Sequence, residues 1–311
     1  MKILITGVAG FIGYHLGKKL LEIGHEIVGI DNLNDYYSPS LKLHRLSMLE
    51  SSNFCFFPLD INEVESLDSK FDLLINLAAQ AGVRIPENKK IYYQSSNVNG
   101  FKKIMNYCKN NSIQKVIYAS SSSVYDDSSK LLFSESETDL CPKSTYGATK
   151  LFNETYANKF KNNLDCIGLR LFSVYGPLGR PDMAYYSFTN SLKNGQEIKL
   201  HNKGLMDRDM TYIDDAVDGI VCSINYLMSS EDIKNEIFNI GNNYPISTIK
   251  LLNTLEKKLK INAKVKHLKV TNESNYTHAN LNKSRKILGY NPKVFFENGI
   301  EKFLDWHQNY E

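Results

Sequence analysis

The chain has 311 residues, of which 42% are hydrophobic and 23% charged, so it has enough apolar material for about two domains or one large one. Its net charge of +3 is dispersed along the sequence, which argues against a nucleic-acid-binding protein with a concentrated basic face. The five cysteines are odd in number and form no Cys-x-x-Cys pair, so we expect no disulfide framework, no metal site and a reducing, cytoplasmic compartment.

The first two-thirds of the chain alternate short apolar runs with amphipathic segments. The apolar runs predict buried strands at Ile3–Ile5, Ile27–Ile30, Cys55–Phe57, Leu73–Ile75, Val116–Ala119 and Ile167–Leu169. Helices are predicted between strands, at Phe11–Ile23, Ile91–Lys109 and Tyr146–Lys161. This alternation indicates an α/β fold with a doubly wound parallel sheet of the Rossmann type. The first run lacks a signal-peptide cleavage site and no run reaches the ~18 residues of a membrane span, so no membrane association is expected.

The pattern changes after about Gly176, where loops lengthen and tyrosine and asparagine become frequent. Helices are predicted at Ser247–Lys260 and Lys283–Leu288, the second ended by Gly289. We therefore expect a larger domain at residues 1–175, completed by segments around 211–242. A smaller domain at 176–311 is expected to cover the carboxyl edge of its sheet.

A glycine-rich turn follows the first predicted strand directly, with the sequence Gly7-Val8-Ala9-Gly10-Phe11-Ile12-Gly13. Glycines permit a tight turn and the close approach of a pyrophosphate. The helix that starts there presents the N–H groups of Phe11, Ile12 and Gly13, and its positive dipole end, to the phosphates. The spacing is one residue longer than the common G-x-G-x-x-G, and a tight strand–helix turn without a ligand is the alternative interpretation.

Residues at the ends of the next strands fit the rest of a dinucleotide. Asp31 ends the second strand, where a carboxylate binds the adenosine ribose hydroxyls and repels a 2′-phosphate, so NAD is favoured over NADP. The alternative role of Asp31 is a helix or turn cap. Asp60 and Ile61 after the third strand, and Leu77, Ala78 and Ala79 after the fourth, are expected to line the adenine and the ribose–pyrophosphate, although the alanines also suit helix–sheet packing.

A candidate chemical site follows the fifth strand, which runs into Ser120-Ser121-Ser122-Ser123. Further on, Tyr146 and Lys150 are four residues apart on one predicted helix face. A nearby ammonium favours the phenolate and lowers a phenol pKa from ~10, so Tyr146 can act as a general base for a sugar hydroxyl. Tyr14 and Lys18 have the same spacing, but we expect them to be structural or at the surface.

Together these residues resemble the extended short-chain dehydrogenase/reductase family over nearly the whole chain. Four segments are similar to nucleotide-sugar 4-epimerases, and most of all to UDP-glucuronate 4-epimerases: Asp31-Asn-Leu-Asn-Asp-Tyr-Tyr37, Leu77-Ala-Ala-Gln-Ala-Gly-Val-Arg84, Arg170-Leu-Phe-Ser-Val-Tyr-Gly-Pro177 and Gly179-Arg-Pro-Asp-Met-Ala184. The resemblance implies NAD as cofactor, a UDP-sugar as substrate and a homodimer formed through the helices 91–109 and 146–161.

The resemblance also implies roles for single residues. Tyr146 is the base, Lys150 its activator and a ligand of the nicotinamide ribose, and Ser121 the hydroxyl partner at the sugar's C4 oxygen. Asn32 and Asn97 are implied as NAD contacts. Around the sugar, the resemblance implies Arg84 and, near the C5 substituent, Ser122, Ser123, Ser173 and Arg180. It implies Arg208 at the diphosphate and Glu273 near the uridine ribose. An arginine fork suits phosphate and carboxylate alike, and the alternative for Arg180 or Arg208 is a surface ion pair.

The predicted reaction is C4 epimerisation of UDP-glucuronate to UDP-galacturonate through a transient 4-keto sugar. A UDP-glucose or UDP-N-acetylhexosamine 4-epimerase would share the same catalytic residues. A sugar 4,6-dehydratase is disfavoured, because it needs carboxylates where this chain has Ser122 and Ser123. A catalytically silent NAD-binding sensor would have no need of Ser121, Tyr146 and Lys150 together.

Overall fold

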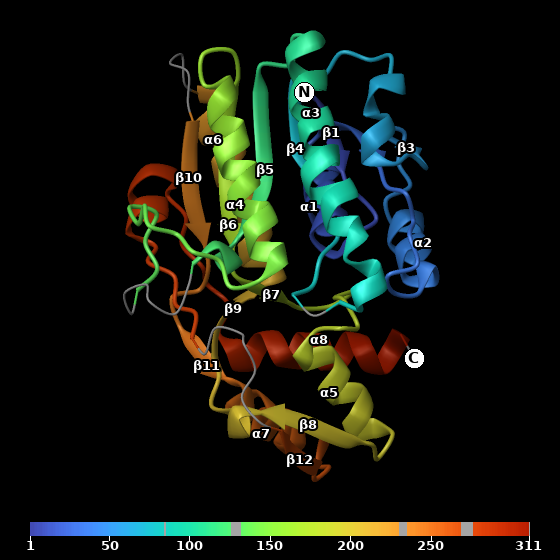
Figure 1. Cartoon of the computed structure of the whole chain (residues 1–311). Coiled ribbons are helices and arrows are strands. Elements are labelled where there is room, and N and C mark those ends of the chain that lie inside the picture. Colours follow the sequence, from blue (N-terminus) through green and yellow to red (C-terminus); the bar gives the residue numbers. More distant parts are fainter. Residues whose placement is uncertain (84, 126–131, 230–234, 269–275, 311) are drawn as a thin grey trace.

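A computed structural model of the chain describes residues 1–83, 85–125, 132–229, 235–268 and 276–310 (Figure 1). Its centre is a seven-stranded sheet in the order β10-β6-β5-β4-β1-β2-β3, and every neighbouring pair is parallel. The strands are β1 (Lys2–Thr6), β2 (Glu26–Ile30), β3 (Phe54–Phe57), β4 (Leu73–Asn76), β5 (Lys115–Ser121), β6 (Asp165–Leu171) and β10 (Asn235–Ile240). The predicted fold class is confirmed.

Helices cover both faces of this sheet, because neighbouring side chains on each strand point to opposite sides. Ile3 and Ile5 of β1 belong to the core that contains residues of α1 (Phe11–Glu22) and α6 (Ile213–Ser229). Leu4 between them belongs to the core that contains residues of α3 (Phe101–Asn110) and α4 (Thr145–Ala157). Figure 1 shows α3 and α4 on one face of the sheet. Both faces are therefore apolar, as the continuous apolar runs predict.

The order of the strands places a crevice at the carboxyl end of β1. The chain proceeds from β1 to β2 and β3 on one side, and β4, β5 and β6 continue on the other. Thr6, the last residue of β1, lies between Ile30 of β2 and Asn76 of β4. The loops that follow these strands diverge here, and this reversal is where doubly wound sheets bind ligands.

The smaller part of the molecule lies below the carboxyl edge of the sheet (Figure 1). Its strands are β7 (Ser173–Tyr175), β9 (Asp207–Tyr212) and β11 (Pro245–Ser247) in one sheet, and β8 (Glu197–His201) and β12 (Lys264–Leu268) in another. Its helices are α5 (Ala184–Lys193), α7 (Thr248–Leu259) and α8 (Phe296–Tyr310). The buried Asp209 carboxylate accepts hydrogen bonds from the backbone N–H groups of Asn242, Asn243 and Ala279, at 2.7, 2.9 and 2.9 Å, and so fixes β9.

Some predicted elements differ in detail from the structure. β3 is not fully buried, since it is the edge strand of the sheet: Cys55 is exposed and Phe57 is 42% exposed. The segment predicted as one helix from Ile91 contains a π-helical stretch, Tyr93–Gly100, before α3. The segment at Ser284–Leu288 is also π-helical and ends at Gly289, whose φ is 69°. None of the described helices is long and apolar enough to cross a membrane.

Candidate active site

A cavity of about 800 Å³ runs along the carboxyl ends of the central strands and continues to β8 in the smaller part. Ile30 of β2, Leu77 after β4 and Ser121 of β5 line its upper part, and Ile198 of β8 lines its lower part. Both parts of the fold therefore contribute to one elongated space. Such a shape suits an extended ligand pair rather than one compact molecule.

The glycine-rich turn forms a phosphate cradle at one wall of this cavity. Gly7 has a φ of 72°, and a Cβ at Gly13 would lie 2.1 Å from the Gly7 carbonyl oxygen, so neither position tolerates a side chain without rearrangement. α1 starts after Gly10 without a side-chain cap and with no acidic residue in its first turn. Its first N–H groups lie next to the cavity, which Gly7, Gly10, Phe11, Ile12 and Gly13 all line. This backbone fits the pyrophosphate of a dinucleotide.

Asp31 lies at the cavity wall and also caps its own turn. Its Oδ1 atom accepts a hydrogen bond from the Leu33 N–H at 2.9 Å. Burial raises the pKa of Asp31, and the nearby ammonium of Lys42 opposes that rise. Lys42 is 5% exposed, lines the cavity and donates to the backbone oxygen of Asn34 at 2.8 Å. The sequence analysis missed Lys42, because a lysine in an amphipathic helix usually faces solvent.

Two predicted cofactor contacts, Asp60 and Asn97, are not among the residues that line the cavity, whereas Asn32, Ile61, Leu77, Ala78 and Ala79 are. Asp60 accepts hydrogen bonds from the Asn62 N–H at 2.9 Å and from the Asn32 amide at 2.7 Å. Asn97 is 1% exposed, and its amide bonds the backbone of Gln80 and the hydroxyl of Thr149. Both side chains thus bond the loops that line the cavity, and their contacts with NAD stay predictions.

The serine turn after β5 and the start of α4 meet closely. A Cβ at Gly147 would lie 2.1 Å from the Ser123 carbonyl oxygen, so glycine next to Tyr146 permits this approach. The Ser144 hydroxyl accepts a hydrogen bond from the Gly147 N–H at 3.0 Å and caps α4. As a result, Ser121 lies beside the Tyr146 phenol, and its influence lowers the pKa of that phenol.

Lys150 lies one turn further along α4 and is 2% exposed. Its ammonium donates to the backbone oxygen of Ala119 at 2.9 Å and lies 5.7 Å from the centroid of the Tyr146 ring. Burial lowers the pKa of Lys150 to about 8. The buried amine lines the cavity and, among the residues that the structure describes, has one acceptor, so it retains donors for a ligand.

The expected lowering of the Tyr146 pKa is wrong for the protein without ligands. Burial raises the pKa of Tyr146 above its usual value, and this effect exceeds the lowering by the Arg180 charge and the Ser121 hydroxyl. Lys150 is not among the groups that lower it. The four-residue spacing correctly predicted that Lys150 lies near Tyr146, but it could not predict whether burial or nearby charges dominate the pKa of the phenol.

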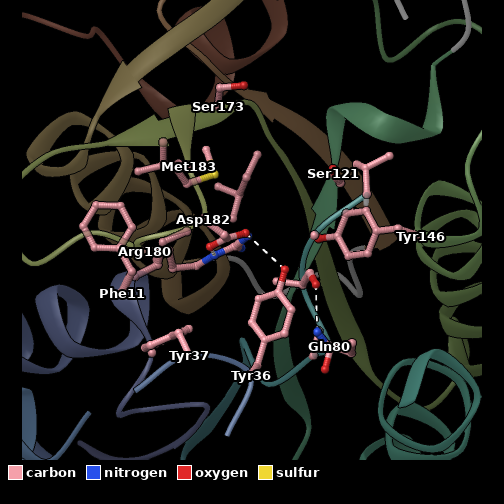
Figure 2. A pocket seen from close by; sticks show the side chains of 18 of the residues that line it. Phe11, Tyr36, Tyr37, Gln80, Ser121, Tyr146, Ser173, Arg180, Asp182 and Met183 are labelled. Carbon is pink, nitrogen blue, oxygen red and sulfur yellow. Dashed lines mark hydrogen bonds and ion pairs between the residues drawn. The ribbon is translucent and has the colours of Figure 1, made fainter. Parts of the chain in front are cut away.

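Arg180 faces Tyr146 across the cavity and is held by an acidic partner (Figure 2). Its Nε and Nη2 atoms donate to the two Asp182 carboxylate oxygens at 3.0 and 2.6 Å. The Tyr36 hydroxyl donates to the same carboxylate at 3.1 Å, and the Tyr36 ring lies 5.9 Å from the guanidinium carbon. Among the described residues, the Nη1 group of Arg180 donates no hydrogen bond. That end of the guanidinium can accept a ligand anion.

The remaining predicted substrate residues are distributed along the same cavity. Ser122, Ser123, Ser173 and Arg208 line it, the last of these in the smaller part. Arg84 and Glu273 lie outside the described residues. Tyr14 does not line the cavity, and its hydroxyl faces the Met48 sulfur at 3.7 Å, in agreement with a structural role.

Three further residues of the site were not singled out from the sequence, although motifs quoted for the resemblance contain them. Tyr36 belongs to the segment that starts at Asp31, and Asp182 and Met183 belong to the segment that starts at Gly179. The motifs therefore contained these three site residues. Which side chain of each motif faces the cavity became visible only in three dimensions.

Comparisons with known proteins agree with this geometry. The sequence profile described as "NAD dependent epimerase/dehydratase family" matches residues 3–241. The chain is 43% identical to an uncharacterized protein of Methanocaldococcus jannaschii, over 98% of this chain and 95% of that one. It is 38% identical to UDP-glucuronate 4-epimerase 4 of Arabidopsis thaliana, over 99% of this chain and 75% of that one. The UDP-glucuronic acid 4-epimerase of Bacillus cereus, solved with UDP-glucuronic acid and NAD, superimposes with a TM-score of 0.92 at 32% identity, covering 100% of both chains.

Proposed function

This chain belongs to the NAD-dependent epimerase/dehydratase family, and from that premise we propose that it is a UDP-glucuronate 4-epimerase. The cofactor is NAD, and the substrates that solved relatives bind are UDP-sugars. The proposed reaction converts UDP-glucuronate into UDP-galacturonate through a 4-keto sugar. No net oxidation occurs, so one bound NAD serves every turnover.

One observation supports this proposal above all: the Tyr146–Ser121 pair and the Arg180 guanidinium face the same cavity from opposite sides (Figure 2). A pyranose placed between them can present its C4 hydroxyl to Tyr146 and its C5 substituent to Arg180. The Nη1 group of Arg180 has no hydrogen bond within the described chain, so a carboxylate can bind it without breaking the Asp182 pair.

The protein side of the mechanism follows from these contacts. Tyr146 takes the proton of the C4 hydroxyl, and Ser121 holds the sugar oxygen in line with the phenol. NAD, when bound, would supply the hydride acceptor and donor for C4. Tyr146 would return the proton to the oxygen when the keto group is reduced from the other face. Lys150 binds near the nicotinamide ribose and brings a second positive charge to the phenol. Arg208 anchors the diphosphate, so the sugar can rotate while the nucleotide stays in place.

Tyr146 needs help to ionise, because burial alone raises its pKa. Arg180 already lowers it, and the Ser121 hydroxyl contributes in the same direction. We infer that ligand binding lowers the pKa of Tyr146 further, since each added cation near the phenol favours the phenolate. Proton removal is then coupled to an occupied site.

The second candidate is a neutral UDP-hexose 4-epimerase, and the Asp182 contact is the observation that favours it. A bidentate carboxylate compensates the charge of Arg180 within the protein. A neutral sugar can therefore occupy the cavity without leaving a buried charge unpaired. A dehydratase fits less well, because Ser122 and Ser123 line the cavity where that reaction needs carboxylates.

We also propose a homodimer formed by the outer surfaces of α3 and α4, which lie side by side on one face of the sheet. Our proposed domains remain a larger one at residues 1–175, completed by segments around 211–242, and a smaller one formed mainly by residues 176–311. The cytoplasm remains the proposed compartment.

A panel of UDP-sugars tests the proposed function. Purified protein is incubated without added NAD with UDP-glucuronate, UDP-glucose and UDP-N-acetylglucosamine, and the products are separated by chromatography. We expect UDP-galacturonate to form from UDP-glucuronate with the highest kcat/KM. Turnover of UDP-glucose alone would establish the second candidate instead.

A further inference from the structure

The guanidinium of Arg45, in α2 (Pro39–Ser47), is buried, and within the described part of the chain it donates hydrogen bonds only to neutral oxygens. Arg45 is 0% exposed. Nε and Nη2 donate to the Leu178 carbonyl at 3.1 and 2.7 Å, and Nη2 also reaches the Gly179 carbonyl at 3.2 Å. Nη1 donates to the Ala9 carbonyl at 2.9 Å and to the Tyr37 hydroxyl at 2.6 Å. These bonds use the full set of guanidinium donors, which is what a buried charge without a carboxylate partner requires.

The carbonyl acceptors belong to two segments that border the cavity, the phosphate cradle and the loop before Arg180. Ala9 lies inside the phosphate cradle, between Gly7 and Gly10. Leu178 and Gly179 directly precede Arg180. A single side chain therefore connects the wall that holds the cofactor to the loop that carries the proposed carboxylate anchor.

The loop before Arg180 needs such support more than the cradle does. Leu178 has a φ of 56°, in the left-handed region that is strained for a residue with a side chain. Two of the Arg45 bonds go to the carbonyl of that residue. The cradle has backbone bonds of its own, from the Gly7 N–H to Ile30 at 2.7 Å and from the Gly10 N–H to Gly7 at 3.0 Å.

We propose that Arg45 is a positioning residue that sets the distance between the cofactor cradle and Arg180. This inference rests on the proposed function, because it assigns Arg180 to the sugar's carboxylate. Hydride transfer at C4 and anchoring at C5 must be satisfied by one sugar pose, and a displacement of ~1 Å can cost ~10²-fold in rate. Arg45 acts on the reaction through the loop at 178–180 and not by touching the substrate.

A double-mutant cycle tests this role in the NAD-containing enzyme. The variants are Arg45→Met, Arg180→Ala and the double variant, with kcat/KM measured for UDP-glucuronate. We expect Arg45→Met to lower kcat/KM by ~10–100-fold, mainly through KM, and to lower it by less than ~3-fold further when Arg180 is already alanine. If the fold-loss of kcat/KM in the double variant equalled the product of the two single-variant losses, the proposal would be overturned.

Two controls separate positioning from general damage. Ile224→Ala removes a side chain that is 2% exposed on α6, away from both segments, and should lower thermal stability without changing the preference for UDP-glucuronate over UDP-glucose. Arg45→Lys keeps the charge and should recover part of the activity and the folded yield if the methionine variant expresses poorly. If Ile224→Ala changed the preference for UDP-glucuronate over UDP-glucose as much as Arg45→Met does, the specific role of Arg45 would be contradicted.

Hydrogen exchange provides a readout that does not depend on the substrate. In Arg45→Met, amides of residues 176–183 should exchange at least ~10-fold faster, while those of residues 7–13 and the bound NAD content stay close to wild type. Unchanged exchange at 176–183 would overturn the Arg45 proposal. If exchange rises but Arg180→Ala leaves UDP-glucuronate turnover intact, the assignment of Arg180 to the sugar's carboxylate fails. If exchange rises but the wild-type enzyme epimerises no UDP-glucuronate, the proposed function fails while the positioning of the loop by Arg45 holds.

Discussion

The phosphate cradle and the Arg180 loop border the same cavity, but they are held in different ways. The cradle is a local structure: Gly7, Gly10 and Gly13 pack against one another's backbone, and the first turn of α1 follows at once. The Arg180 loop depends on distant side chains, with Tyr36 bonded to Asp182 and Arg45 bonded to Leu178. Cofactor binding is thus encoded locally, whereas substrate recognition depends on tertiary contacts that can change while the fold remains.

The largest expected effect concerns Tyr146, which lines the same cavity as both regions. Tyr146→Phe removes the proposed base and should lower kcat by ~10²–10⁴-fold, the usual contribution of general acid–base catalysis, while NAD remains bound. Steady-state kinetics and the absorbance of extracted NAD check both parts. Tyr14→Phe is the matched control, since Tyr14 has the same spacing to a lysine but does not line the cavity. Full activity of the Tyr146 variant would remove this phenol from the mechanism.

A smaller and more selective effect is expected on the substrate side. Arg180→Ala should lower kcat/KM for UDP-glucuronate by ~10–100-fold, because a charge-assisted pair to the carboxylate contributes ~1.5–3 kcal/mol. For UDP-glucose the loss should stay within ~5-fold. Arg208→Ala, at the proposed diphosphate anchor, serves as the comparison and should weaken both substrates alike. Equal losses for both substrates in Arg180→Ala would reassign that residue to the diphosphate or to structure.

The smallest expected effect concerns stability and its pH dependence on the cofactor side. Burial lowers the pKa of Lys150 from 10.5 to about 8, so the folded protein carries a penalty for the ammonium at every pH below 8. Lys150→Met should stabilise the NAD-free protein there by ~1–3 kcal/mol, since each pKa unit corresponds to ~1.4 kcal/mol.

The pH dependence of stability expected here is opposite to that of a lysine whose pKa is raised in the folded protein. As the pH rises from 8 towards 10.5, folded Lys150 loses its proton before the unfolded chain does, so the wild type gains stability and the advantage of methionine disappears. Urea denaturation at pH 7 and pH 10 measures this change, with the exposed Lys18→Met as control. An advantage that is independent of pH would contradict the assigned cause.

Much of the fold and part of the site could be predicted from sequence. Apolar runs located the strands of the parallel sheet, and the glycine spacing located the cradle, because both follow from rules that act within a few residues. The pairing of Tyr36 with Asp182 joins residues 146 positions apart, and no local pattern predicts such a contact. The bonds from Asp60 to Asn32 and from Asn97 to Gln80 and Thr149 are likewise visible only in the structure.

The direction of the Tyr146 pKa shift was the other property that could not be predicted from the sequence. A four-residue spacing places Lys150 beside Tyr146, but the pKa of the phenol depends on burial and on Arg180, which comes from a different loop. The motif identified the pair correctly. The direction of the pKa shift in the free protein required the structure.

Isotope tracing at C4 tests most directly the claim that a captive NAD removes a hydrogen from the sugar and returns it. UDP-glucuronate carrying deuterium at C4 is incubated with the purified enzyme in ordinary water without added NAD, and the product is examined by mass spectrometry and NMR. We expect UDP-galacturonate that retains deuterium at C4. Product in which the deuterium has been replaced by solvent hydrogen would contradict that claim, as would a complete absence of epimerised sugar.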